Sequence, residues 1–128
     1  MSLPSPLWRV SSDGRADLEL RHTRVQAGIL AHATCQGKAL LRSLPVLAKH
    51  LSFGLRDRQE LERTEVSVAR RPGIRVLLRG RLDGIPVKAE AYVIKGERCV
   101  YDMVYVAPPE EFSAGESDFQ AFVRSFTP

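Results

Sequence analysis

Hydrophobic and polar residues alternate along much of this chain, which is the pattern of β-strands with one buried face. In residues 7–22, "LWRVSSDGRADLELRH", the turn residues Ser11-Ser12-Asp13-Gly14 separate two such stretches and predict a β-hairpin. The apolar positions of the second stretch are Ala16, Leu18 and Leu20. After a turn near Gly28, a third strand is predicted to carry on one face Ile29, Ala31, Ala33 and Cys35.

The apolar spacing becomes helical between residues 40 and 55. One stripe of this helix would hold Leu40, Leu44, Leu47, Ala48, Leu51 and Leu55. Pro45 is unfavourable inside a helix, so either the helix kinks there or Ser43 caps a helix whose first turn holds Pro45. We prefer the second alternative, a main helix over residues 44–55 with Gly54 near its C-terminal end.

A long hairpin is the clearest element of the chain. A strand with Val66 and Val68 precedes it and is predicted to end at the Arg71-Pro72-Gly73 turn; before that strand, a solvated polar connection would contain Glu60, Glu62 and Glu65. Asp83-Gly84 is a preferred two-residue hairpin turn, which sets the register. The pairs on one face are then apolar or glycine throughout: Leu82–Ile85, Gly80–Val87, Leu78–Ala89, Val76–Ala91 and Ile74–Val93. The other face pairs Arg79 with Lys88 and Arg75 with Tyr92.

The last two elements are a strand and a helix. Residues 99–106 are apolar on both faces, which indicates a central strand covered on both sides. Pro108-Pro109 ends this strand. A terminal helix over residues 117–126, capped by Ser117 or a neighbour, would bury one stripe formed by Phe119, Phe122, Val123 and Phe126. The fold class predicted is α+β, an antiparallel meander flanked by helices.

Length and composition agree with this fold. At 128 residues, the chain is predicted to form a single globular domain over residues 1–128, with residues 1–6 as a disordered leader. A hydrophobic content of 44% and a charged content of 27% exclude an intrinsically disordered class. No run of 18 apolar residues is present, so no membrane span is expected.

The charge pattern suggests one candidate binding surface. The net charge of +4 permits an anionic partner without demanding one. One face of the hairpin gathers the basic residues Arg75, Arg79, Arg81 and Lys88. Their mutual repulsion could be relieved by a bound anion or a nucleic-acid backbone, or by neighbouring Glu90 and Asp102 in an ordinary solvated face. For Asp102 we favour a salt bridge beside the basic face over a tuned acid.

Cys35 and Cys99 are the two cysteines of the chain. They form a disulfide if the protein is exported, or remain two reduced and mostly buried thiols otherwise. His32 precedes Cys35 by three positions, but two cysteines and one histidine do not make a structural zinc site, so no metal is expected.

Motifs for catalysis are missing from the sequence. Gly37-Lys38 lacks the upstream glycine of a phosphate-binding loop, and no Gly-x-Ser-x-Gly elbow occurs. The three histidines are scattered without spaced carboxylate partners: His22, His32 and His50. We therefore predict a protein that is not an enzyme and that uses no cofactor.

The C-terminal half resembles a known family. "CVYDMVYVAPPEEF" followed by "DFQAFVRSF" is similar to the end of PsbP-like and DcrB-like domains, where an aromatic-rich central strand leads to a Phe-rich helix. "LDGIPVKAEAYVI" resembles their penultimate hairpin, and the match covers residues 61–126. The resemblance implies an antiparallel sheet between helices. It transfers no functional residue to this chain.

The resemblance also implies a biological setting. Similar domains are small exported or lipid-anchored proteins of the bacterial envelope that act as accessory or assembly factors. The expected function is therefore a non-catalytic binding domain of the envelope whose partner is an envelope protein or a small ligand, with membrane contact only through a lipid anchor that this chain does not contain. The N-terminus carries no signal peptide, so either a leader has been removed or the protein is cytoplasmic. The alternative function is a cytosolic module that binds anions or nucleic acid through the basic hairpin face.

Overall fold

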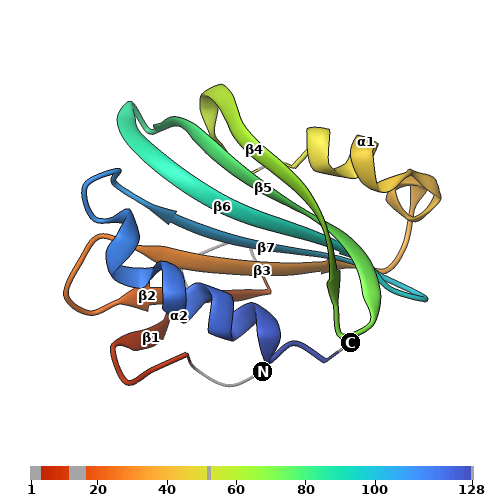
Figure 1. Cartoon of the computed structure of the whole chain (residues 1–128), viewed down its shortest axis with the longest axis horizontal. Helices are drawn as coiled ribbons and strands as arrows, with labels where there is room; N and C mark the ends of the chain where they lie inside the picture. The colour runs from red at the N-terminus through yellow and green to blue at the C-terminus, as the bar shows by residue number, and fades with distance from the viewer. Residues whose placement is uncertain (1–3, 12–16, 52, 128) are drawn as a thin grey trace.

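The computed structural model describes residues 4–11, 17–51 and 53–127. In this part of the chain, seven strands form one antiparallel sheet in the order β1-β2-β3-β7-β6-β5-β4 (Figure 1). The strands are β1 (Trp8–Ser11), β2 (Leu18–His22), β3 (Gly28–Thr34), β4 (Arg56–Val68), β5 (Arg71–Leu82), β6 (Ile85–Lys95) and β7 (Val100–Ala107). The helices are the 3-10 helix η1 (Lys38–Leu41), α1 (Leu44–Lys49) and α2 (Phe112–Arg124). The α+β antiparallel meander is thus confirmed.

The two faces of the sheet have separate apolar cores, because successive side chains of a strand point to opposite faces. Ile94 of β6 belongs to the core that includes α2, and its neighbour Val93 belongs to the core that includes α1. We call these the α2 face and the α1 face. The strands β6 and β7 supply these cores with ten buried apolar residues: Val87, Ala89, Ala91, Val93, Ile94, Val100, Met103, Val104, Tyr105 and Ala107.

The β5–β6 hairpin has the predicted register. Leu82 lies opposite Ile85, and the ladder continues through Gly80–Val87 to Ile74–Val93. Asp83 and Gly84 both have positive φ, 51° and 80°, as a tight hairpin turn of this kind requires. β7 is also confirmed as the central strand, since it lies fourth of the seven between β3 and β6.

The polar stretch before Val66 was wrongly interpreted as a connection. It is the first part of β4, a strand at the edge of the sheet that pairs with β5. The turn lies at Ala69 and Arg70, with φ of 50° and 64°, while Arg71-Pro72-Gly73 begins β5. Most of β4 is exposed on both faces, so it lacks the alternation by which strands are recognised. Charged side chains on an edge strand discourage pairing with other chains.

Helix α1 begins as predicted but is shorter. Ser43 occupies the N-cap position, and Pro45 lies in the first turn. The helix ends at Lys49, although Leu51 and Leu55, which lie between the helix and β4 in the sequence, remain buried. The guanidinium of Arg58 donates hydrogen bonds to the carbonyls of Leu51 and Leu55, which satisfies backbone acceptors that a helix would have used.

Helix α2 begins at Phe112, five residues before the predicted start. The Tyr105 hydroxyl donates to the Phe112 carbonyl at 2.7 Å and accepts from the Gly115 amide at 3.1 Å, so a side chain of β7 holds the first turn. A Cβ at Gly115 would lie 2.7 Å from this hydroxyl, which explains the glycine. The predicted apolar stripe is buried in full: Phe119, Phe122, Val123 and Phe126.

The N-terminal segment also packs against α2. β1 pairs with β2 as the first hairpin predicted, with Val10 opposite Leu20. The predicted turn residues Ser12-Asp13-Gly14, and Ala16, lie outside the described residues. The Trp8 indole donates to Asp118 at 3.0 Å, and Ser5, which we expected in a disordered leader, donates to the same carboxylate at 3.0 Å. β3 ends at Thr34, so Cys35 follows the strand rather than belonging to it.

Candidate functional site

The predicted basic residues lie on the α2 face of the β5–β6 hairpin. Arg75, Arg79 and Arg81 occupy alternate positions of β5, and Lys88 of β6 lies directly opposite Arg79. Strand periodicity therefore places all four on one face, as the hairpin register required. Their surroundings differ, however, because one end of this face is covered by α2.

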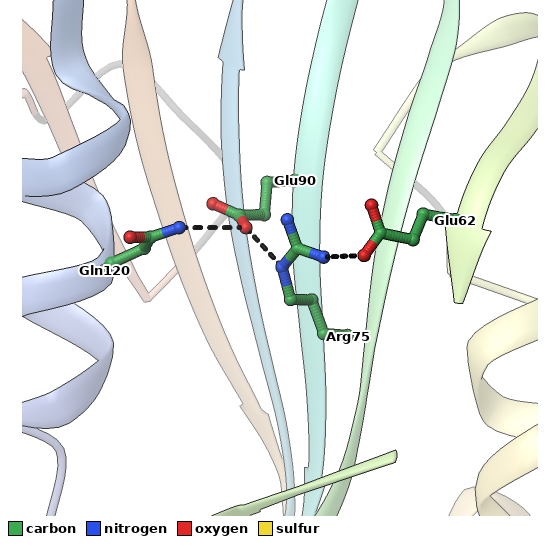
Figure 2. A network of polar contacts seen from close by, with 4 residues as sticks. All are labelled: Glu62, Arg75, Glu90 and Gln120. Atoms are coloured by element: carbon green, nitrogen blue, oxygen red, sulfur yellow. Dashed lines mark hydrogen bonds and ion pairs between the residues drawn. The ribbon is translucent and has the colours of Figure 1, made fainter. Parts of the chain in front are cut away.

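Arg75 is the centre of a polar network that joins three strands to a helix. Figure 2 shows Arg75 between Glu62 of β4 and Glu90 of β6, with Gln120 of α2 on the far side of Glu90. Arg75 Nε lies 2.5 Å from Glu90 Oε2, and Arg75 Nη1 lies 3.1 Å from Glu62 Oε1. Gln120 donates to the same Glu90 oxygen at 3.4 Å. The network connects α2 to the edge strand through charged side chains.

Burial determines the electrostatics of this network. The Glu90 side chain is 0% exposed and that of Arg75 is 17% exposed. Burial raises the pKa of Glu90, and the hydrogen bond and charge of Arg75 limit that rise. Burial alone would lower the pKa of Arg75, but the hydrogen bond and charge of Glu90 outweigh it and raise this pKa. Glu90 Oε1 is buried and has no hydrogen-bond partner among the described residues.

The other three basic residues have weaker contacts. Arg81 donates to the Gly84 carbonyl at 3.3 Å and lies 4.0 Å from Asp57. The Lys88 ammonium lies 4.7 Å from the centre of the Phe112 ring, a cation–π contact. Arg79 is exposed. The four cations therefore do not form one free surface: Arg75 is occupied by two carboxylates, and Arg79 with Arg81 is the most solvated part. Anion binding at these residues stays a prediction.

Two acidic residues have different roles from those expected. Glu62 was predicted to be solvated in a connection, but it reaches Arg75 because its segment is a strand. Asp102 was expected beside the basic face, but it pairs with Val93 of β6 and lies on the α1 face. Burial raises the pKa of Asp102 to about 6, and the charge of neighbouring His32 opposes the rise. Gln120 was not predicted as a site residue, because the sequence pattern around it is that of the buried phenylalanine stripe.

Cys35 and Cys99 form a disulfide in the structure. Thr34 and Val100 are the last pair of the β3–β7 ladder, and the next pair in the same register is Cys35 with Cys99. Their Cα atoms lie 4.1 Å apart, across a sequence separation of 64 residues. Neither residue is fully buried, in contrast to the buried thiols of the alternative prediction. The ladder itself therefore presents the two thiols to each other at one end of the sheet.

Within the described residues, no group of three or more His, Cys, Asp or Glu side chains could hold a metal ion. His32 Nδ1 lies 3.2 Å from Asp17, but both side chains are about half exposed or more. None of the helices described there has the length and apolarity required to cross a bilayer.

No family model and no curated protein matches the sequence. Solved structures, in contrast, share the fold. A Pseudomonas aeruginosa protein of unknown function, PA94, described as a putative regulator, has a TM-score of 0.63 at 13% identity over 94% of this chain and 81% of its own. LpqN of Mycobacterium tuberculosis, involved in cell envelope biogenesis, has a TM-score of 0.61 at 14% identity over 94% and 78%.

The PsbP protein (CyanoP) of Synechocystis has the same fold with a TM-score of 0.56, at 10% identity over 94% of this chain and 80% of its own. The PsbP-like fold predicted from the aromatic strand and the Phe-rich helix is therefore confirmed. At these identities the likeness concerns the fold alone.

Proposed function

We propose that this chain is a non-catalytic accessory domain of the bacterial cell envelope and that it acts by binding an envelope protein or a small ligand. The observation that carries the proposal is the disulfide between Cys35 and Cys99. Disulfides persist in oxidising compartments and are rare in the cytosol, where thiols are kept reduced. A cross-link at the exposed end of a sheet is suited to an exported domain.

The fold supports the same setting. LpqN, which shares the fold, is described as involved in cell envelope biogenesis, and CyanoP is a PsbP protein. Because a fold hosts many functions, this support concerns the setting and not a molecular activity.

The arrangement of charged groups supports binding rather than catalysis. Arg75 and Glu90, the most buried ion pair among the described residues, neutralise each other and connect α2 to the sheet. A catalytic acid or base needs access to substrate in a concave site, whereas Glu90 lies beneath a helix. Arg75 and Glu90 therefore serve the packing of the domain, and its exposed surfaces are left for a partner.

Trapping of the thiols in cells tests the proposal. Cells that produce the full-length gene product are quenched in acid, and free thiols are labelled with a mass-tagged maleimide before and after reduction. We expect no labelling of Cys35 and Cys99 before reduction and two labels after it. A Cys35→Ser variant is the control, because it leaves one cysteine that is labelled in both conditions. Two labels before reduction would contradict the envelope assignment.

Fractionation in the same cells completes the test. We expect the domain to be degraded by protease added to cells whose outer layer has been opened, while a cytoplasmic marker survives. Protection together with the marker would favour the cytoplasmic alternative.

A further inference from the structure

A groove of about 480 Å³ lies at the end of the sheet where the β5–β6 turn, the end of β7 and the β2–β3 connection meet. Its apolar wall continues the core of the α1 face beyond α1 itself. Four residues form this wall: Leu30, Leu82, Val87 and Val106. Ile85 stands at the rim with 56% of its surface exposed. The groove therefore offers apolar surface that the domain does not cover.

Glu19 lines the same groove. It lies opposite Leu30 in the β2–β3 ladder, so its side chain points to the α1 face beside that apolar wall. Only 6% of Glu19 is exposed, which is unusual for a charged residue. Its Oε1 atom lies 2.7 Å from the guanidinium of Arg21, whose side chain is 66% exposed.

The other carboxylate oxygen of Glu19 is left unsatisfied. Oε2 is buried and has no hydrogen-bond partner among the described residues. A buried acceptor without a donor has lost its hydrogen bonds to water and has gained no hydrogen bond within the protein, which costs free energy. A ligand that brings a donor into the groove would remove this cost, and the free energy recovered would contribute to the affinity for that ligand.

The charges around the groove indicate which donor is preferred. Its lining contains two negatively charged side chains, Glu19 and Asp83, and the positively charged Arg21, whose guanidinium is already paired with Glu19 Oε1. His22, also in the lining, accepts the backbone amides of Arg24 and Val25 through Nδ1. A positively charged donor forms the stronger bond to a carboxylate, while a negatively charged ligand would meet two like charges.

We propose that this groove binds a small primary amine that carries a short apolar chain. The ammonium group donates to Glu19 Oε2, and the chain lies against Leu30, Val87 and Val106. The site lies on the α1 face, opposite the basic hairpin residues, and it is independent of the compartment in which the protein works.

Amide-resolved NMR titration of the whole chain tests the proposal with three probes of equal chain length: hexylamine, hexanol and hexanoate. We expect hexylamine at neutral pH to shift the amides of Glu19, Leu30 and Val106 in a saturable manner. Hexanol should bind about tenfold more weakly, because it lacks the charge-assisted bond, and hexanoate should not shift these amides. Equal binding of hexanoate and hexylamine would overturn the proposal.

Two variants and a control separate the carboxylate from the apolar wall. Glu19→Gln keeps the shape and should weaken hexylamine about tenfold or more while leaving hexanol little changed. The matched control is Glu65→Gln on β4, an exposed glutamate at the opposite side of the sheet, which should bind hexylamine as the parent does. Retention of full hexylamine affinity by Glu19→Gln would refute the role of Glu19.

Ile85→Ser is a second variant that tests the groove even if Glu19→Gln fails to fold. Since Ile85 is mostly exposed, this change should leave the fold intact and weaken hexylamine and hexanol alike. If neither probe is affected by it, the groove is not the site.

Discussion

Removing the guanidinium of Arg75 should destabilise the domain because of the carboxylate it leaves behind. Glu90 is 0% exposed, and Arg75 provides its closest cation, 2.5 Å away. In Arg75→Met, a side chain of similar length fills the space but carries no charge, and Glu90 keeps only the 3.4 Å contact from Gln120. The perturbation therefore creates a buried, uncompensated carboxylate.

The magnitude follows from the depth of burial. Breaking a buried ion pair by removing one partner costs about 3–5 kcal/mol. The Arg75 side chain retains 17% exposure, and Gln120 still donates to Glu90, so the lower end applies, about 3 kcal/mol. For a domain of this size that corresponds to a fall in melting temperature of roughly 10–15 °C.

The double variant distinguishes this explanation from a loss of packing. Arg75→Met with Glu90→Leu removes both charges, and replacing a whole buried ion pair by apolar residues is often neutral or stabilising. We expect the double variant to recover most of the stability, which gives a favourable coupling of about 2 kcal/mol or more in the double-mutant cycle. Urea denaturation followed by circular dichroism measures each unfolding free energy.

The pH dependence provides a second criterion. Burial already raises the pKa of Glu90, and removing Arg75 raises this pKa further. A carboxyl group whose folded pKa exceeds its unfolded pKa contributes stability at low pH that is lost as the pH rises through the folded value. The cost of Arg75→Met should therefore be larger at pH 7 than at pH 5. If the cost is the same at both pH values and the double variant is not rescued, the buried-charge explanation is refuted.

Three further predictions concern other parts of the molecule. Phe122→Ala, at a residue of α2 that is 1% exposed, should lower the unfolding free energy by about 3–5 kcal/mol, and superimposable urea melts of variant and parent would contradict the docking of this helix. Asp102→Asn should raise the unfolding free energy at pH 8 by at most about 3 kcal/mol and leave it unchanged below pH 4. The reason is that burial raises the pKa of Asp102 to about 6, so that only the charged form is penalised in the folded protein. An effect in thermal melts that does not depend on pH would contradict this explanation. Since Arg75 is occupied by Glu62 and Glu90, the purified domain should not shift single-stranded or duplex nucleic acid at micromolar concentration; a gel shift that disappears at moderate salt and on Arg79→Ala would instead establish the anion-binding alternative.

Local patterns were sufficient for the elements that are both regular and buried. The β5–β6 register followed from Asp83-Gly84 and the alternation around it, because a two-residue turn fixes one pairing, and in that pairing the alternating apolar residues of the two strands share one face. The central position of β7 followed from its two apolar faces. The Phe stripe likewise predicted that the C-terminal helix would dock.

Elements whose existence or bounds depend on contacts with other elements could not be predicted from local sequence patterns. β4 is a strand because β5 offers it hydrogen bonds, and its exposed side chains carry no trace of that pairing. The first turn of α2 is held by the Tyr105 hydroxyl, so its start depends on a residue in the preceding strand. Helix α1 ends early where Arg58 takes over the carbonyls of Leu51 and Leu55.

The candidate sites depended on the tertiary structure most of all. The sequence by itself placed Arg75 on a face with other cations, and only the arrangement of β4, β6 and α2 brought Glu62, Glu90 and Gln120 around it. The sequence left open whether the two cysteines are reduced or form a disulfide. The β3–β7 register places Cys35 opposite Cys99, which allows the disulfide. The burial of Glu19 has no sequence signal, because the surroundings of a side chain are created by strands that are distant along the chain. Periodicity reports which side of an element is buried, whereas the partner that buries it is chosen by the packing of the whole sheet.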